Sequence, residues 1–142
     1  MRSLRSIRPA IKCHGGKYFL SQWITSQSPE RYPDLSYVEP FCGGASVLLN
    51  EPRSAFEVIN DLDPAVQDPY TAMRDDAEQF PRELELLDYS GTTFHRAIVR
   101  QGPVRAGVDR AGNKFVLRRM SRGGLRTAFA WSERLRGGQP VA

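Results

Sequence analysis

The spacing of apolar positions in the first half of the chain predicts two helices and two strands. Residues 17–26 place apolar side chains at helical spacing, so that one face of a helix would carry Phe19, Leu20, Trp23 and Ile24. Residues 36–39 and 56–60 are short apolar runs rich in β-formers, which favours strands. Residues 44–50 follow a glycine pair and carry a short helical pattern.

The second half of the chain is predicted to be a succession of helices. Asp63 can cap the free N–H groups of a helix, and Pro64 suits a first turn, so a helix is expected over residues 64–74. Three further helical patterns follow, at residues 77–87, 92–100 and 110–122. Two consecutive glycines would end the last of these helices.

This inventory predicts an α/β fold that is helix-rich and has an incomplete parallel sheet. Two parallel strands have little chance of burying both faces and both edges of a sheet by themselves. We therefore expect the sequence to be truncated: either a downstream polypeptide completes the domain, or the chain is a remnant of a larger protein.

The composition indicates an ordinary globular chain but does not indicate a particular function. The chain has 142 residues, 40% of them hydrophobic and 25% charged, which is ordinary for one soluble domain or part of one. It has no apolar stretch near the roughly 18 residues that span a bilayer, so a cytoplasmic location without a membrane partner is expected. Cys13 and Cys42 are expected to be reduced, and His14 and His95 lack metal-ligand spacing, so no metal site is predicted.

The net charge of +4 hides a strong asymmetry along the chain. Residues 51–89 carry eleven acids and three bases, whereas residues 96–136 carry eleven bases and two acids. One interpretation is a positive face that binds a polyanion. The other is that the two blocks neutralise each other in the fold, and the sequence favours neither.

A glycine turn lies between the two predicted strands. Residues 38–45 read Val-Glu-Pro-Phe-Cys-Gly-Gly-Ala, and the second strand ends at Asp61, which is the layout of a nucleotide-binding βαβ unit. The turn would cradle a ligand and Asp61 would accept hydrogen bonds from ribose hydroxyls, while Glu39 would accept from an ammonium group or from the loop. The NAD fingerprint Gly-x-Gly-x-x-Gly is absent, and the Glu-Pro-Phe lead-in favours S-adenosylmethionine. The residues expected to line the ligand are Glu39, Pro40, Phe41, Gly43, Gly44 and Asp61.

Two further segments carry candidate chemistry. Residues 12–17, Lys-Cys-His-Gly-Gly-Lys, would bring Lys17 to a helix entrance as a cation for a ligand carboxylate or carbonyl. Residues 114–138 interleave arginines with aromatic residues, which favours nucleic-acid contact, although a basic amphipathic helix followed by a solvated loop has the same pattern. The candidate DNA-binding residues are Arg118, Arg119, Arg122 and Arg126.

These segments, in this order, resemble the adenine-specific DNA methyltransferases of the Dam type. The resemblance covers about residues 10–136 and rests on residues 12–17, 37–45, 59–63 and 115–125. It implies the N-terminal part of a Rossmann-like methyltransferase fold that binds S-adenosylmethionine, with cofactor contacts at Cys13, Lys17 and Asp61. It also implies a cofactor-binding half at residues 1–95 and the start of a DNA-recognition region at residues 96–142.

Three departures from the family pattern bear on function. An aromatic residue commonly stands at the position of Cys13, so stacking on the cofactor adenine would be lost. Ala45 replaces the third loop glycine, which is expected to be mild because alanine tolerates a helix start. The family's Asp-Pro-Pro-Tyr loop would lie beyond residue 142, so no catalytic residue is assigned. The similar tripeptide Asp68-Pro69-Tyr70 lacks one proline and is expected on the surface of a helix.

The sequence thus predicts a DNA adenine-N6 methyltransferase that uses S-adenosylmethionine, acts on double-stranded DNA and is inactive as this chain alone. The alternative is a basic nucleic-acid-binding remnant without catalysis. A fragment of an NAD-dependent enzyme is a third hypothesis.

Overall fold

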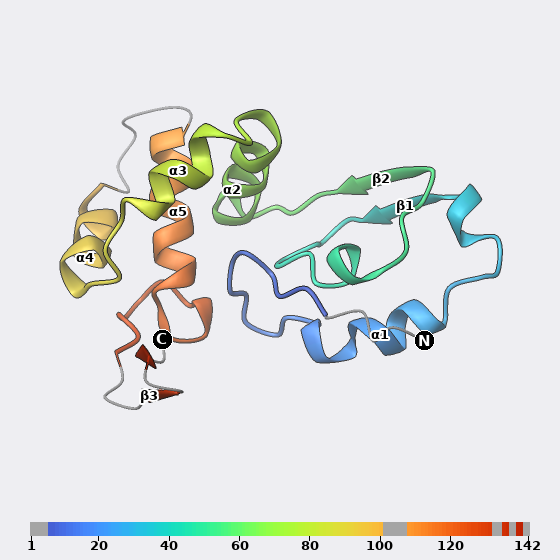
Figure 1. The fold of residues 1–142 in the computed structure, drawn as a ribbon, viewed down its shortest axis with the longest axis horizontal. Helices are drawn as coiled ribbons and strands as arrows, with labels where there is room; N and C mark the ends of the chain where they lie inside the picture. Colours follow the sequence, from blue (N-terminus) through green and yellow to red (C-terminus); the bar gives the residue numbers. More distant parts are fainter. Residues whose placement is uncertain (1–5, 101–107, 132–134, 137–138, 141–142) are drawn as a thin grey trace.

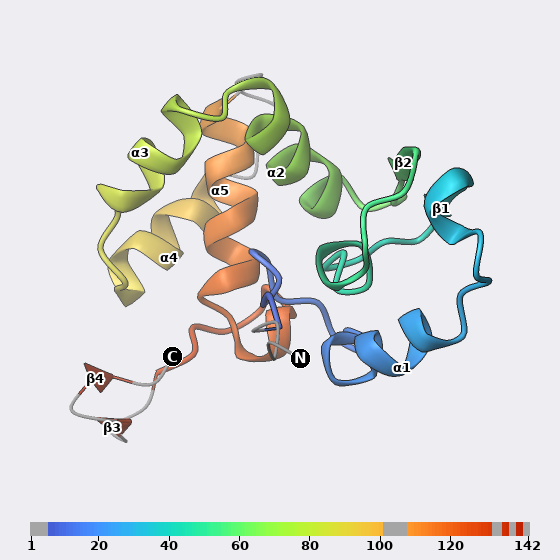
Figure 2. The same cartoon turned by 45° about the vertical axis from the view of Figure 1, so that its right-hand side comes forward.

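The computed structural model describes residues 6–100, 108–131, 135–136 and 139–140. In Figure 1 the helices α2 to α5 form one half of the molecule, and the strands β1 and β2 with helix α1 form the other. The N-terminal segment crosses between the halves and lies beside the C-terminal end of α5 in both ribbon views (Figures 1 and 2). None of the helices in the described part is long and apolar enough to cross a membrane.

The two predicted strands form and pair in parallel. Strand β1 (Ser36–Glu39) lies beside β2 (Phe56–Ile59), in register from Ser36 opposite Phe56 to Glu39 opposite Ile59. The described residues hold one other sheet, an antiparallel pair of β3 (Leu135–Arg136) and β4 (Gln139–Pro140). Val38 and Phe56 remain exposed, so the parallel sheet is not the centre of the core.

The core instead surrounds helix α5 (Val108–Arg119), as Figure 2 shows. Helices α2 (Pro64–Asp75), α3 (Gln79–Glu85) and α4 (Gly91–Val99) pack on α5. Two apolar clusters join these helices to α5: Phe94, Ala97, Val116, Leu117 and Met120 in one, and Ala72, Phe80 and Ala111 in the other. A third cluster ties the glycine turn to α2 through Ile11, Cys42, Ala45 and Val66.

Most of the predicted helices are confirmed, with shifted ends. Asp63 is the N-cap of α2, and its carboxylate accepts a hydrogen bond from the Ala65 N–H at 2.8 Å. Helix α4 is capped by Ser90, whose hydroxyl accepts a hydrogen bond from the Thr93 N–H, so the helix begins one residue before the predicted start at residue 92. The predicted boundary between the cofactor-binding half and the DNA-recognition region, at residue 95, lies inside α4. Helix α5, from the second part, packs on α2, from the first. The division stays a prediction about function.

The helix predicted over residues 44–50 is wrong. The chain forms turns there and then one 3-10 turn, η3 (Leu48–Asn50). Gly43 and Ala45 have φ angles of 51° and 49°, in the left-handed region that a right-handed helix excludes. Ala45 therefore does not begin a helix, and its replacement of glycine is not mild: it holds an L side chain where glycine is unstrained.

The helix predicted at residues 17–26 is shorter and more exposed than expected. A 3-10 turn, η1 (Tyr18–Leu20), precedes α1 (Ser21–Ser26). Three of the four residues of its predicted apolar face are exposed, with 93% of Phe19 and 64% of Trp23 accessible, and only Ile24 is partly buried. A second 3-10 turn, η2 (Tyr32–Asp34), leads into β1.

Candidate functional site

Two bends of the chain face each other around a pocket of about 200 Å³. One bend is residues 13–17 and the other is residues 39–44, with Asp61 between them at the end of β2. Seven of the eight predicted cofactor residues line the pocket: Cys13, Lys17, Glu39, Phe41, Gly43, Gly44 and Asp61. The eighth, Pro40, is not among the lining residues, and its carbonyl accepts from the Asn60 side chain at 3.0 Å.

The parallel pairing of β1 and β2 brings these residues together. The carboxyl ends of parallel strands meet at one edge of a sheet, and here two backbone hydrogen bonds continue the pairing beyond both strands. Asn60 N–H donates to the Glu39 carbonyl at 2.9 Å, and Cys42 N–H donates to the Asn60 carbonyl at 2.8 Å. The glycine turn is thereby fixed against the residues that follow β2.

Asp61 is held by backbone groups on both of its carboxylate oxygens. Gly43 N–H donates to Oδ2 at 2.8 Å, and Asp63 N–H donates to Oδ1 at 3.0 Å. Each carboxylate oxygen has a second acceptor site, so Asp61 can still accept from ligand hydroxyls. The side chain is half-buried and therefore has a fixed direction in the pocket wall.

Glu39 stabilises the loop that contains the glycine turn by accepting hydrogen bonds. Its Oε1 accepts from the Leu48 N–H at 2.9 Å and from the Tyr37 hydroxyl. Burial and the hydrogen bond to Glu39 raise the pKa of Tyr37. Glu39 was predicted to accept from a ligand ammonium group or from the loop, and these contacts show hydrogen bonding to the loop.

The pocket also holds one cation and two thiols. Lys17 is exposed, and its ammonium group donates to the Gly15 carbonyl at 2.8 Å. Cys13 and Cys42 are both free thiols. Burial, with a contribution from the Asp61 charge, raises the pKa of Cys42 to about 11, and burial raises that of Cys13 as well. Both groups are therefore weak nucleophiles at neutral pH.

Sequence reasoning missed Ser46, which lines the same pocket. It is 4% exposed, and its hydroxyl has no hydrogen-bond partner among the described residues. A buried hydroxyl without a partner is costly unless water or a ligand satisfies it. No sequence signal marked this residue, because it falls where a helix was predicted.

Tyr70 was placed on the surface of a helix, and the structure corrects this. The tripeptide Asp68-Pro69-Tyr70 does lie within α2, but the Tyr70 hydroxyl donates to the Gly44 carbonyl at 2.7 Å and Pro69 is fully buried. Tyr70 faces inward because it packs against the cluster that ties α2 to the glycine turn, while Asp68 pairs with Arg110 of α5. Tyr70 therefore supports the wall of the pocket.

A second pocket of about 280 Å³ adjoins the first along α2. Cys42 and Asp61 line both pockets and so stand between them. The remaining lining residues of the second pocket are Ile59, Asn60, Val66, Gln67, Tyr70, Thr71 and Arg74. A ligand longer than one pocket would pass Asp61.

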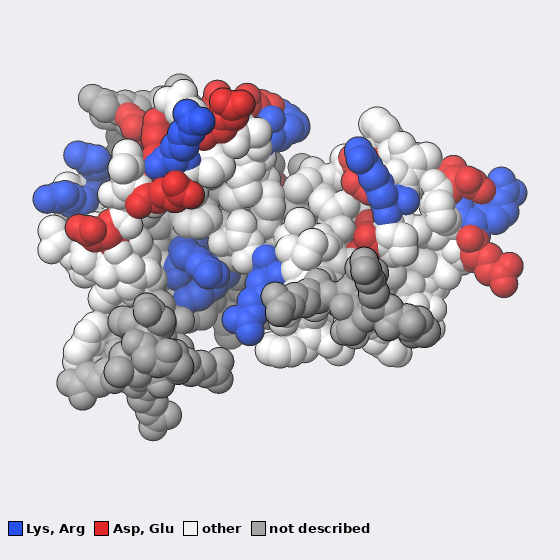
Figure 3. Space-filling model, viewed as in Figure 1, with Lys and Arg blue, Asp and Glu red and all other residues white. Residues whose placement is uncertain are grey.

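The acidic and basic blocks neutralise each other in part. Arg118 and Arg126 pair with Asp63 at 2.5 and 3.2 Å, and Arg110 pairs with Asp68 at 2.9 Å. On the face in Figure 3, acidic and basic side chains are mixed over the upper part of the helical half, whereas basic side chains alone are seen lower down, toward the middle of the molecule.

The four candidate DNA-binding arginines differ in their surroundings. The Arg118 side chain is 11% exposed and is bound to Asp63 and to the Gly124 carbonyl. Arg126 is partly exposed, whereas Arg119 and Arg122 are exposed. DNA contact stays a prediction for all four, with Arg119 and Arg122 the most accessible.

A glycine turn after one parallel strand, with an acid at the end of the next, is an arrangement found in α/β proteins that bind a nucleotide-like cofactor at the strand ends. The chain matches the family model of the D12 class N6 adenine-specific DNA methyltransferases over residues 14–96. The match covers more than half of the chain, so the chain belongs to this family, and the resemblance seen in the sequence is confirmed. Comparison with curated proteins gave no match, and comparison with solved structures gave none either.

Proposed function

We propose that this chain binds S-adenosylmethionine between its two bends and serves the adenine-N6 DNA methylation of its family. The observation that carries the proposal is the meeting of Lys17 and Asp61 at one pocket, from segments 44 residues apart. Both residues fall inside the family match. The NAD alternative is disfavoured because its glycine fingerprint is absent.

The residues of the pocket fit this cofactor. Its amino-acid part carries both charges and its ribose carries two hydroxyls, and the pocket offers a lysine, two carboxylates and the Ser46 hydroxyl, which has no partner among the described residues. Lys17 would hold the carboxylate, Asp61 the ribose hydroxyls, and Ser46 a polar atom near the glycine turn. S-adenosylmethionine supplies a methyl group activated by its sulfonium.

The chain's own residues hold the cofactor site rigid. Glu39 and Asp61 each accept a backbone N–H of the loop that follows β1, at Leu48 and Gly43. Tyr70 binds the same loop through the Gly44 carbonyl. Positioning of this kind is the main contribution of a protein to a cofactor-driven transfer.

We further propose that this chain alone does not transfer the methyl group. An adenine amine needs a group that orients it outside the base stack. Asp68-Pro69-Tyr70 cannot act so in this structure, because Asp68 is paired with Arg110, Pro69 is buried and Tyr70 is bound to Gly44.

Calorimetric titration with S-adenosylmethionine tests the proposal. We expect the wild type to bind, and Lys17→Ala to weaken binding about tenfold because it removes one charge-assisted hydrogen bond. Arg31→Ala is the matched control, since Arg31 is an exposed cation outside the pocket. Absence of binding by the folded wild type, or tighter binding of NAD, would refute the proposal.

A non-catalytic nucleic-acid-binding role is the second candidate, favoured by exposed Arg119 and Arg122. A gel shift with duplex DNA that weakens with salt, in a protein that does not bind S-adenosylmethionine, would support it over the first. Incorporation of labelled methyl groups into DNA by the chain alone would instead contradict both this candidate and the proposed inactivity.

A further inference from the structure

We infer that Arg118 is a positioning residue for the cofactor pocket and acts through Asp63 and Asp61 on the Gly43 N–H. The inference rests on the proposed function for the identity of the ligand. It assigns a role in the cofactor site to the arginine-rich segment (residues 114–138), although this segment lies outside the family match at residues 14–96.

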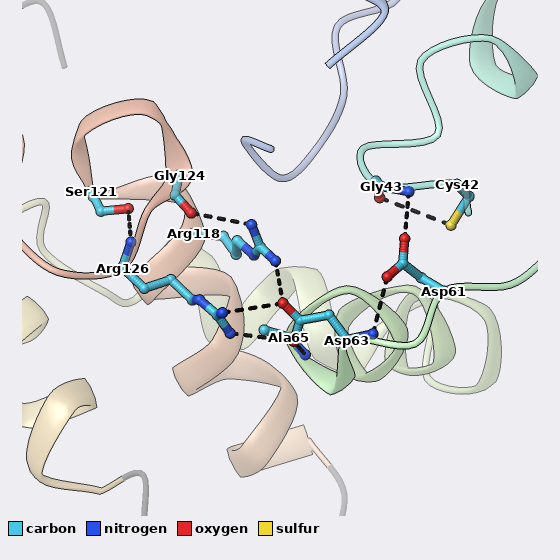
Figure 4. Close-up of polar contacts among 9 residues, drawn as sticks. All are labelled: Cys42, Gly43, Asp61, Asp63, Ala65, Arg118, Ser121, Gly124 and Arg126. Carbon is cyan, nitrogen blue, oxygen red and sulfur yellow. Dashed lines mark hydrogen bonds and ion pairs between the residues drawn. The ribbon is translucent and has the colours of Figure 1, made fainter. Parts of the chain in front are cut away.

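A continuous set of polar contacts leads from the glycine turn to Arg118 (Figure 4). Gly43 N–H donates to Asp61, and Asp61 also accepts from the Asp63 N–H. The Asp63 carboxylate then accepts from Arg118 at 2.5 Å. Asp61 and Asp63 are two residues apart, so a change in the backbone at Asp63 must be felt at Asp61.

Arg118 is the better enclosed of the two arginines that bind Asp63. Its side chain is 11% exposed, against 38% for Arg126, which approaches the same carboxylate at 3.2 Å. Burial alone would raise the pKa of Asp63, but the Ala65 N–H and the two guanidinium groups outweigh burial and hold the pKa below its usual value. Asp63 is thus kept charged as a fixed partner for Arg118.

Arg118 is also linked, through Gly124, to the residue that precedes the opposite wall of the pocket. Its Nη1 donates to the Gly124 carbonyl at 3.2 Å, and Gly124 lies directly against the Lys12 backbone. Lys12 precedes the bend at residues 13–17 that forms this wall. One guanidinium is therefore linked to both walls: to the glycine turn through Asp63, and to the first bend through Gly124, which packs against Lys12.

The chain offers a matched control for the packing of the two helices. Arg110 and Asp68 form a second ion pair between α5 and α2, at 2.9 Å. Neither residue lines the first pocket or the second. Loss of this pair weakens the contact between the same helices but leaves the link to Asp61 intact.

Calorimetry with S-adenosylmethionine on wild type, Arg118→Ala, Arg118→Lys and Arg110→Ala tests the inference. We expect Arg118→Ala to weaken binding about three- to thirtyfold, the range typical of residues that act through a network. Arg118→Lys should recover part of the loss, because lysine keeps the charge but cannot span Asp63 and Gly124 together. Arg110→Ala should bind as the wild type does.

A measurement without cofactor separates this inference from the proposed function. The amide resonance of Gly43 reports its hydrogen bond to Asp61, and we expect it to move in Arg118→Ala and to stay in place in Arg110→Ala. A wild type that binds no S-adenosylmethionine would refute the proposed function, while the Gly43 resonance would still decide the positioning role. Equal effects of both variants, on binding or on Gly43, would overturn the inference. Should Arg118→Ala not fold, Arg118→Lys against Arg110→Lys decides the same question.

Discussion

Gly124 is the position where a single methyl group should do most damage. It lies in the 3-10 turn η4 (Arg122–Gly124), where Gly123 and Gly124 have φ angles of 60° and 74°. A Cβ atom on Gly124 would stand 2.1 Å from the Lys12 carbonyl oxygen. A Cβ atom on Gly123 would meet only the His14 Nδ1, at 4.0 Å. The neighbouring glycines therefore make a matched pair.

The expected magnitudes follow from these contacts. Alanine at either position enters the left-handed region at a cost of about 1–2 kcal/mol, offset by about 0.4–1 kcal/mol because alanine stiffens the unfolded chain. Gly123→Ala should thus lose about 1 kcal/mol. Gly124→Ala must in addition displace the Lys12 backbone, and overpacking of this kind costs about 1–3 kcal/mol more.

Urea unfolding followed by circular dichroism measures both losses, since the described fold is helix-rich. We expect Gly124→Ala to lose about 2–4 kcal/mol in the free energy of unfolding, and to bind S-adenosylmethionine more weakly because the wall next to Lys12 shifts. Equal stability of the two variants would show that Gly124 does not pack against Lys12, and the account of this wall would fail.

Three further predictions address single side chains of the site. Ser46→Ala should leave stability unchanged or raise it by up to about 1 kcal/mol, because it removes a hydroxyl without a described partner, yet should weaken S-adenosylmethionine binding in calorimetry. Tyr70→Phe should lose about 1 kcal/mol in urea unfolding with its hydrogen bond to Gly44, and an unchanged midpoint would contradict that contact. The pKa of Asp63 is lower in the folded chain than in the unfolded chain, where it is about 4. The stabilisation by its charge is therefore present above about pH 4 and is lost as the pH falls through the folded pKa. Asp63→Asn should flatten the acid side of a plot of unfolding free energy against pH.

The features that the sequence predicted well are those set by neighbouring residues. Asp63 before Pro64 predicted both the cap and the start of α2, since capping depends on two or three adjacent positions. The two short β-rich runs predicted β1 and β2, and their parallel pairing brought Asp61 to the glycine turn. These local rules were enough to predict seven of the residues that line the pocket.

The features that the sequence did not reveal depend on contacts between distant residues. Ala45 has a left-handed φ in a turn that is tied to distant residues, since Cys42 N–H donates to the Asn60 carbonyl, and an apolar pattern over residues 44–50 carries no sign of such contacts. The inward direction of Tyr70 depends on which face of α2 meets the glycine turn. Asp63, the partner of Arg118, lies 55 residues away in the sequence, so the basic segment gave no sign that Arg118 would be buried.

The two acids after β2 connect the candidate cofactor pocket to the arginines at residues 118 and 126. Asp61 turns toward the glycine turn, where it binds Gly43, and Asp63 turns toward α5, where it caps α2 and binds two guanidinium groups. Because the Asp63 N–H also donates to Asp61, the two carboxylates share one short stretch of backbone. The Arg118 guanidinium is thus bound to Asp63 and to the Gly124 carbonyl, whereas Arg119 and Arg122 are exposed; contact of these two with a phosphate backbone stays a prediction.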